Sequence, residues 1–394
     1  MAVKLILTQI MKDESHVAKR MLDSIKNIVD GICVVDTGST DDSIEIVENW
    51  GKENNVETYV IKRPFDNFEN SRNCSFEKAR EKFLPETDDG NVYYNFWLDF
   101  DEQLIIDETF DKQSLDKDLY MFDTYIGQMK YTRNELVRLD MGFRFYGPIH
   151  EYIIPPKDKP NVTSDVLKGV KVDVKTDGAS WQENVQMKYI SHAHVLEKYI
   201  SENRKDPRWI FYTAQSYHDS SNIDNKDERD ERLRRAIRYY KERVERPDGF
   251  AEERFYSQLR IGSIMKRMEE PWNLTLQALL KAYSIEPTRG ESIKVIIDYY
   301  LQIGEWDLAY MYADFGLRNF HNKNPYPNKL LFIDNNLYVW KFLEVYSAAC
   351  YYTGRKEEAK KAYIEMLDVS KTEPGSFNQE DLNKIETNKK FFLN

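Results

Sequence analysis

Short apolar runs alternate with segments that carry apolar residues at helical spacing along the first part of the chain. The apolar runs predict buried strands, and they are KLILTQI, GICVVDTG, VETYVIKR and YYNFWLDFD. The segments between them predict helices, namely SHVAKRMLDSIKNIV, DDSIEIVENWGKEN and SRNCSFEKAREKF. This alternation, with strands that are apolar throughout, indicates a parallel sheet covered by helices on both faces.

The pattern changes after about residue 118. Three segments there predict shorter strands that extend the sheet in antiparallel fashion, LYMFDTYIG, MKYTRNELVRL and FRFYGPIHEYII. Residues 155–190 are polar and rich in proline at their start, so we expect loops and hairpins.

From about residue 196 the pattern is helical to the end. The predicted helices are PRWIFYTAQSYHDS, ERLRRAIRYYKERVER, EERFYSQLRIGSIMKRM, PWNLTLQALLKAYSI, GESIKVIIDYYLQIG, EWDLAYMYADFGLRN, NLYVWKFLEVYSAACYYTG and RKEEAKKAYIEMLDV. They pair into hairpins of roughly 34–40 residues, a period typical of tetratricopeptide-like solenoids. We therefore expect an α/β domain over residues 1–195 and an all-α repeat domain over residues 196–394.

Composition narrows the classes of function. The net charge of -11 argues against a nucleic acid or an anionic membrane as the main partner. No apolar run approaches the roughly 18–20 residues of a membrane span, and the first residues turn charged too soon for a signal peptide. The three cysteines, Cys33, Cys74 and Cys350, are widely spaced and form no CxxC pair. We expect a reduced, cytoplasmic protein without disulfides or a cysteine zinc site.

Carboxylates follow two of the predicted strands. Asp36 ends the strand in VVDTGSTDDS, at the kind of strand end where open parallel sheets bind ligands, and it could accept from a ribose hydroxyl or a base N–H. For Asp41 in the same segment, we favour a helix-capping role. The run NFWLDFDEQL ends in Asp99, Asp101 and Glu102. Ionised carboxylates are costly to bury unless paired, so these either reach solvent or meet a cation.

Five segments occur in one order along residues 5–153: the strand and Lys-Asp-Glu near the N-terminus, VVDTGSTDDS, NSRNCSFEKA, WLDFDEQL and GPIHEYI. Together they resemble the family-2 glycosyltransferases of the GT-A fold. More specifically, they resemble the subgroup with C-terminal tetratricopeptide-like repeats, which includes peptide S-glycosyltransferases. FYTAQSYHD and AIRYYKER fit this subgroup less specifically. The resemblance implies a Rossmann-like mixed sheet flanked by helices, followed by the helical repeats.

The resemblance also implies a donor site. Glu14 and Asp36 would contact the uridine or ribose of a nucleotide-sugar, although Asp13 stands where the family has Asn. Arg72 and Asn73 match the family's Arg-Asn pair, and a guanidinium can pair with the diphosphate. A surface helix charge is the alternative for Arg72.

The D-x-D position of the family matches Asp99-Phe100-Asp101, which implies Mn²⁺ or Mg²⁺ held against the diphosphate. In related enzymes the second carboxylate binds the metal directly, here Asp101. The first, Asp99, more often orients the ribose or the donor sugar. Glu102 would extend the cluster and hold sugar hydroxyls.

Two histidines lie in YISHAHV, residues 189–195. His192 and His194 alternate as in a strand, which would point both to one side. The resemblance implies a late histidine that completes the metal shell. His192 matches that position better than His194, and a structural role is the alternative for both.

The segment GPIHEYI matches the family's Trp-x-Gly-x-x-His-Glu, with Tyr146 close to the usual Trp. An inverting transferase needs a general base that takes the proton of the acceptor. Glu151 is the candidate and His150 the second choice, with a packing role for His150 left open. A thiol acceptor would need the base less, because thiols ionise readily.

The leading hypothesis is thus a metal-dependent, inverting glycosyltransferase with a UDP-linked sugar donor, whose helical repeats bind a peptide, protein or glycan acceptor. Solenoids often self-associate, so a homodimer through the helical half stays open. A second hypothesis is a binding scaffold with a degenerate N-terminal domain. A third, a nucleotidyltransferase, is disfavoured because LTQIMKDES lacks the glycine-rich loop of that chemistry. The donor sugar and the linkage atom stay open.

Overall fold

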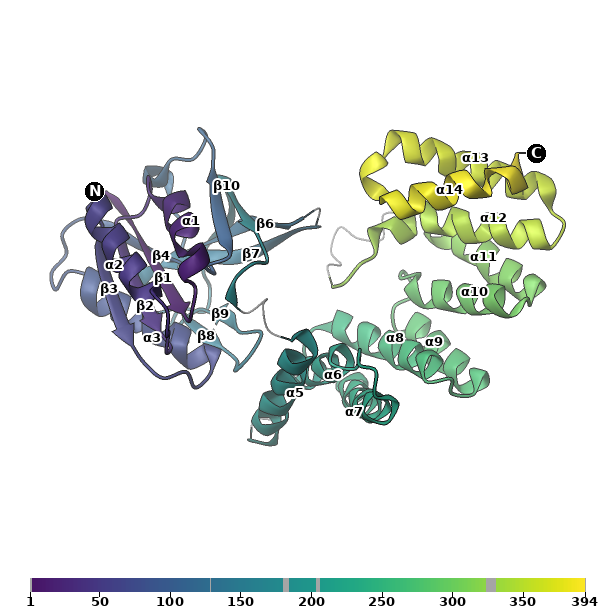
Figure 1. The fold of residues 1–394 in the computed structure, drawn as a ribbon, viewed down its shortest axis with the longest axis horizontal. Helices are drawn as coiled ribbons and strands as arrows, with labels where there is room; N and C mark the ends of the chain where they lie inside the picture. Colours follow the sequence, from purple (N-terminus) through teal and green to yellow (C-terminus); the bar gives the residue numbers. More distant parts are fainter. Residues whose placement is uncertain (1, 128, 180–183, 203–205, 324–330, 394) are drawn as a thin grey trace. The chain divides into compact units, whose positions relative to one another are not determined.

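The computed structural model describes residues 2–127, 129–179, 184–202, 206–323 and 331–393. The chain forms two compact units, Met1–Lys188 and Tyr189–Asn394 (Figure 1). The division falls inside helix α5 (Val185–Glu202), slightly before the predicted boundary after residue 195.

An eight-stranded mixed sheet forms the centre of the first unit, with the order β3-β2-β1-β4-β7-β6-β10-β5. Its strands are β1 (Val3–Met11), β2 (Gly31–Asp36), β3 (Glu57–Lys62), β4 (Val92–Phe96), β5 (Glu102–Ile106), β6 (Leu119–Ile126), β7 (Met129–Arg138) and β10 (Ser164–Val174). Strands β1 to β4 are parallel. Strand β7 runs antiparallel to both β4 and β6. The carboxyl ends of β1, β2 and β4 therefore share one edge of the sheet.

Three helices cover the parallel half of the sheet, α1 (Ser15–Ile25), α2 (Ser43–Asn54) and α3 (Phe68–Phe83). Leu5 and Leu7 of β1 share one core cluster with apolar residues of α1 and α2. Ile6, between them, belongs to a different cluster with Ala79 of α3. Because successive side chains of a strand point to opposite faces, α3 covers the face opposite to α1 and α2.

The antiparallel part differs in detail from the prediction. The segment FRFYGPIHEYII forms a separate two-stranded sheet of β8 (Arg144–Tyr146) and β9 (Tyr152–Ile154). The stretch 155–190, predicted as loops and hairpins, contains the long strand β10, and its residues 180–183 lie outside the described residues. Val170, Val172 and Val174 alternate inward on β10, a two-residue period that the surrounding polar residues obscured. Strand β4 ends at Phe96, before the carboxylates.

The second unit is helical. After α5 its helices are α6 (Pro207–Asp219), α7 (Lys226–Glu245), α8 (Ala251–Arg267), α9 (Trp272–Ile285), α10 (Glu291–Ile303), α11 (Trp306–Phe320), α12 (Phe342–Tyr352), α13 (Lys356–Thr372) and α14 (Gln379–Phe392). Short 3₁₀ turns lie at Lys112–Ser114, Leu139–Met141 and Pro374–Ser376, and a π-helical turn precedes α12 at Leu337–Lys341.

Helices α6 to α13 confirm the eight predicted segments, and α14 lies in the stretch predicted as helical to the end, where no separate segment was given. They pack as antiparallel hairpins in chain order, α6 with α7, α8 with α9, α10 with α11 and α12 with α13 (Figure 1). The predicted architecture, a mixed sheet flanked by helices and then helical repeats, is confirmed. Within the described part of the chain, no helix is long and apolar enough to cross a membrane.

The strand predicted for residues 189–195 is wrong. His192 and His194 lie in the middle of α5. Its buried residues Ala193, Leu196 and Ile200 have helical spacing, which outweighs the brief alternation of the two histidines. Residues two apart on a helix are separated by roughly 200°, so the two rings point to different sides.

Candidate active site

Three strand ends of the first unit carry four of the predicted site carboxylates. Strand β2 ends at Asp36, which pairs in register with Met11, the last residue of β1. Glu14 follows β1 and directly precedes α1. Asp99 and Asp101 follow β4 in a short loop before β5. The parallel strands therefore bring the carboxylates to one edge because of their topology, as the strand-end argument predicts.

Asp36 is buried, and its carboxylate holds the turn that follows β2. It accepts hydrogen bonds from the backbone N–H groups of Gly38 and Ser39, with the shortest contacts to each at 3.2 Å. Gly38 has φ +115, a conformation that favours glycine. The Asp36 side chain thus shapes the turn at the sheet edge.

Asp41 has a helix-capping role, as favoured from the sequence. Its carboxylate accepts from the backbone N–H groups of Ser15 and Ser43, each at 3.0 Å, at the starts of α1 and α2. Burial alone would raise the pKa of Asp41, but the hydrogen bonds from Ser43 and Ser15 outweigh it and lower the pKa to about 2. Asp41 therefore ties two helix N-termini together.

Arg72 of α3 lies at the centre of the site. Its Nε donates to Glu151 Oε1 at 2.6 Å, and its Nη2 donates to Asp99 Oδ1 at 2.9 Å. The guanidinium also lies 5.4 Å from the centre of the Phe145 ring. Burial alone would lower the pKa of Arg72, but Asp99 and Glu151 outweigh it and raise that pKa. The surface-charge alternative for Arg72 is wrong, because the side chain is almost fully buried.

One hydrogen-bond donor of Arg72 is unsatisfied. Its Nη1 is buried and has no hydrogen-bond partner within the described residues. Buried polar groups are nearly always paired in folded proteins, by protein, water or ligand.

Glu102 positions the loop between β4 and β5. Its Oε2 accepts from the backbone N–H of Asp99 at 2.9 Å, and both carboxylate oxygens accept from Arg133 Nη2 at 2.7 Å. Glu102 is 2% exposed, whereas the Asp99 side chain is 48% exposed. Burial raises the pKa of Glu102, against the attraction of Arg133. The Glu102 oxygens are thus engaged with the protein itself.

Arg133 was not predicted from the sequence. It lies on β7, where it also hydrogen-bonds to the buried Glu135. A signal was present, since Arg133 and Glu135 are opposite charges two residues apart on a predicted strand, which places both side chains on one face. The partner Glu102 lies too far away in sequence for a local pattern to reveal.

Glu14 and Asp101 lie near one another. A Cβ atom built on Gly178 would lie 3.1 Å from Asp101 Cβ and 3.4 Å from Glu14 Oε2, so a side chain at this position would crowd both residues. Glu14 Oε2 also accepts from the backbone N–H of Ala179 at 3.1 Å. Burial raises the pKa of Glu14 to about 7, and the negative charges of Asp101 and Asp99 add to the rise.

Asn73 is engaged with the small sheet. Its side-chain Nδ2 donates to the carbonyl of Phe145 at 2.9 Å, and its Oδ1 accepts from the N–H of the same residue at 2.8 Å. The nitrogen and the oxygen of the Asn73 amide therefore both link α3 to strand β8. A direct contact of Asn73 with a donor stays a prediction.

The two candidate bases sit in different environments. The Glu151 side chain is 12% exposed and is held by Arg72, whereas His150 is exposed. His150 has φ +54, in the left-handed region that costs a non-glycine residue backbone energy. The loop is also fixed by Glu69, whose Oε2 accepts from the N–H of Gly147 at 2.8 Å.

A metal shell made by the protein alone is absent from the described ranges, where no three His, Cys, Asp or Glu side chains form a group that could hold an ion. His192 and His194 belong to the second unit. Their part in a metal site stays a prediction.

Residues 10–107 match the model of glycosyl transferase family 2. Two curated relatives each share 22% identity over 233 residues, the SPbeta prophage-derived glycosyltransferase SunS of Bacillus subtilis (strain 168) and the glycosyltransferase SunS of Bacillus phage SPbeta. The aligned region is 59% of this chain and 53% of each relative. The chain thus spans about half the length of the curated relatives it matches.

Solved structures with some likeness include S. aureus TarS, at a TM-score of 0.34 and 10% identity, covering 73% of this chain and 53% of that chain. MamA has a TM-score of 0.35 and 14% identity, covering 50% of this chain and 96% of that chain. Because these TM-scores are low, the fold rests on the strand order and the helical hairpins described above. Residues 10–107 are thus similar to family-2 glycosyltransferases, and helical hairpins follow in the second unit.

Proposed function

We propose that the protein is a metal-dependent, inverting glycosyltransferase that moves a sugar from a UDP-linked donor to a peptide, protein or glycan acceptor. One observation carries the proposal. At the shared edge of β1, β2 and β4, the buried Arg72 forms ion pairs with both Asp99 and Glu151. A group suited to a diphosphate is thereby joined to the D-x-D loop and to the proposed base.

Arg72 is the proposed diphosphate ligand. Its Nη1 is a buried donor that the described residues leave unsatisfied, and a phosphate oxygen is a suitable acceptor for a guanidinium. Glu14 and Asp36 would face the nucleoside, with Asp36 acting mainly through the turn that it holds. Glu102 acts through the backbone of Asp99 in this proposal.

The carboxylates fit a hard divalent cation, Mn²⁺ or Mg²⁺. Burial raises the pKa of Glu14, and the nearby negative charges of Asp101 and Asp99 add to that rise. Mg²⁺ is commonly held by one or two carboxylates plus substrate phosphates, so Asp101 and Asp99 suffice as protein ligands. When bound, the ion would offset the charge that grows on the leaving nucleoside diphosphate.

Glu151 is the proposed general base. The Nε of Arg72 donates to one of its oxygens at 2.6 Å, which orients the carboxylate. A base must be ionised to take a proton from the attacking acceptor atom. His150 is the second candidate because it is exposed next to Glu151.

We also propose a cytoplasmic location. Cys33, Cys74 and Cys350 are all free thiols in the structure, which fits a reducing compartment.

The test is a donor screen with the full chain. UDP-, GDP- and TDP-sugars would each be incubated with the protein, in Mn²⁺ or in EDTA, and release of the nucleoside diphosphate measured. We expect release from one UDP-sugar in Mn²⁺, and loss of at least about a hundredfold in EDTA or in Asp101→Asn, because the charge on the leaving group is then not offset.

The matched control is Asp88→Asn, which makes the same chemical change in an exposed turn and should release at the wild-type rate. Some transferases release the nucleoside diphosphate only when an acceptor is present. Calorimetric titration of each donor therefore accompanies the screen. Neither release nor binding of any donor by the folded protein would overturn the proposal and favour the scaffold hypothesis.

A further inference from the structure

The segment Leu331–Phe332, between α11 and α12, makes contacts far from its neighbours in sequence. It touches α6, α8 and the turn before α10, which belong to three successive hairpins. Helix α8 in turn packs against both α6 and α10. A two-residue stretch thus contacts two successive hairpins through α6 and α8, and the turn that leads into a third.

Its main chain is held by two charged side chains. Arg289 Nη1 donates to the carbonyl of Leu331 at 2.9 Å, and Nη2 donates to the carbonyl of Phe332 at 3.3 Å. The backbone N–H of Leu331 donates to Glu252 Oε2 at 2.9 Å. Three main-chain polar groups of these two residues are therefore recognised without regard to side-chain identity, as in peptide binding.

Its aromatic side chain lies on two rings. Phe332 stacks on Phe211 of α6, with centroids 6.5 Å apart, and packs on Tyr256 of α8 at 4.7 Å. Phe211 and Tyr256 are buried, whereas Phe332 remains 45% exposed. The ring therefore lies at the surface over two buried rings rather than in the core.

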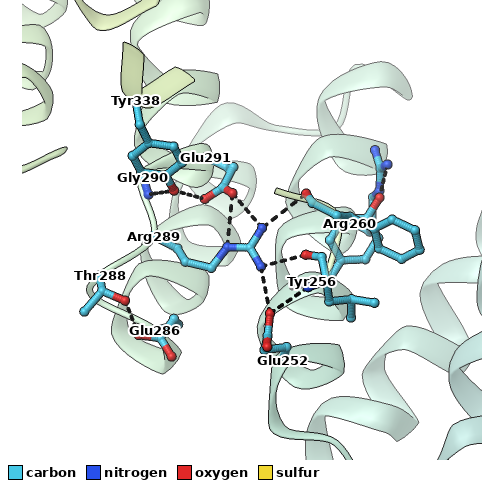
Figure 2. A network of polar contacts seen from close by, with 11 residues as sticks. Glu252, Tyr256, Arg260, Glu286, Thr288, Arg289, Gly290, Glu291 and Tyr338 are labelled. Carbon is cyan, nitrogen blue, oxygen red and sulfur yellow. Dashed lines mark hydrogen bonds and ion pairs between the residues drawn. The ribbon is translucent and has the colours of Figure 1, made fainter. Parts of the chain in front are cut away.

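The polar part of this face is organised by residues outside the segment. Glu291 Oε1 accepts from both Nε and Nη2 of Arg289 (Figure 2). The Arg289 guanidinium also lies 4.5 Å from the centre of the Phe255 ring. Tyr338 donates to the other oxygen of Glu291 at 2.9 Å (Figure 2). Arg289 would thus keep its orientation if the segment left.

The segment itself is held in an unfavourable conformation. Phe332 has φ +51, a left-handed value that a bulky residue rarely adopts. Such strain persists only where the surroundings impose it. A peptide that offered the same groups in a relaxed conformation would compete well.

We propose that the face formed by Phe211, Glu252, Tyr256 and Arg289 is a peptide-binding site that the chain's own Leu331–Phe332 segment occupies. The ligand is a polypeptide segment with an aromatic residue, and it binds by displacing the resident segment. This proposal does not depend on sugar transfer, because it concerns binding alone.

The test uses a fluorescein-labelled peptide of residues 331–336, LFIDNN, with the full chain. Fluorescence anisotropy would compare wild type with Phe332→Ala, which removes the resident side chain and leaves the site residues intact. We expect the variant to bind the peptide about tenfold more tightly or better, because the competing occupant is weakened. The peptide LAIDNN should not bind.

The control is Phe391→Ala, since Phe391 is similarly exposed at 48% but lies in α14. It should bind the peptide as weakly as wild type does. No binding to folded Phe332→Ala, or equal binding by all three proteins, would overturn the proposal and make the segment a structural strap.

A second measurement keeps the proposal testable if Phe332→Ala does not fold. Hydrogen exchange of the wild-type Leu331 amide would be followed with increasing unlabelled LFIDNN. Displacement of the segment should speed exchange at that amide, and LAIDNN should have no effect. Unchanged exchange at millimolar LFIDNN would contradict displacement.

Discussion

At the scale of single residues, two arginines hold three carboxylates of the candidate site. Arg72 is shared by Asp99 and Glu151, and Arg133 holds Glu102. Such pairs make the loop after β4 rigid, because the backbone N–H of Asp99 is itself held by Glu102. Preorganised charges are what a transferase needs where new charge develops.

The role of the Arg133–Glu102 pair can be measured. Arg133→Met should lower the free energy of unfolding by about 3 kcal/mol, because Glu102 would remain buried without a counter-charge. It should also weaken donor binding, since the Asp99 loop loses its support. Urea denaturation and donor calorimetry are the measurements.

Arg138→Met is the matched control on the same strand. Arg138 pairs with Asp140, whose side chain is 47% exposed, so this change should cost less than about 1 kcal/mol. If the two variants lost the same free energy of unfolding, burial of the partner carboxylate would not explain the loss in Arg133→Met.

At the scale of elements, strand β10 contains a bulge at Gly169. Its pairing with β6 shifts between Val166 and Lys171, and Gly169 lies within the shift with φ +76. A β-bulge of this kind bends a strand, and glycine suits it because of its positive φ. Beyond the bulge, β10 pairs with β5, the strand that begins at Glu102.

Gly169→Ala should therefore destabilise the first unit by about 3 kcal/mol. The added Cβ would lie 2.6 Å from the backbone nitrogen of Phe110, which cannot move aside like a side chain. Thermal and urea unfolding would measure the loss.

The comparison is Gly142→Ala. Gly142 has φ +86 but open space around its missing side chain, so only the backbone strain of about 1–2 kcal/mol should appear. If the two variants were equally stable, the steric argument for the bulge would be wrong.

At the scale of the whole molecule, each unit has buried residues of its own. The first unit has its largest core cluster between the sheet and helices α1 and α2, and the second buries large side chains such as Trp209, Tyr240 and Ile296. A chain of 394 residues exceeds the usual size of a single core. Two separately folding units are the expected result.

A fragment of residues 185–394 should therefore fold alone. We expect helical circular dichroism and a cooperative thermal transition, because α5 is retained and its Tyr199 packs edge-on against Trp209. The shorter fragment 206–394 lacks α5 and should melt at a lower temperature. An unfolded longer fragment would contradict independent folding of the second unit.

The sequence by itself determined the helices, the parallel strands and the strand-end carboxylates. These depend on local periodicity, and the carboxyl ends of parallel strands meet at one edge whatever the details. Asp36 and Asp99 were found in this way. Strand β10 was missed because its inward valines are spread among polar residues, and His192 was misplaced because three alternating residues are too few to define a strand.

Only the tertiary structure decided which charges meet. Arg72 contacts Asp99 and Glu151 across 27 and 79 residues of sequence, and Arg133 reaches Glu102 across 31. No local pattern encodes such pairs, because sheet order and helix placement bring them together. The same holds for Arg289 and the carbonyl of Leu331, which are 42 residues apart. Local periodicity specifies helices and strands. The pairing of charged side chains is decided only when the chain packs, because a buried charge is costly unless an opposite charge lies beside it.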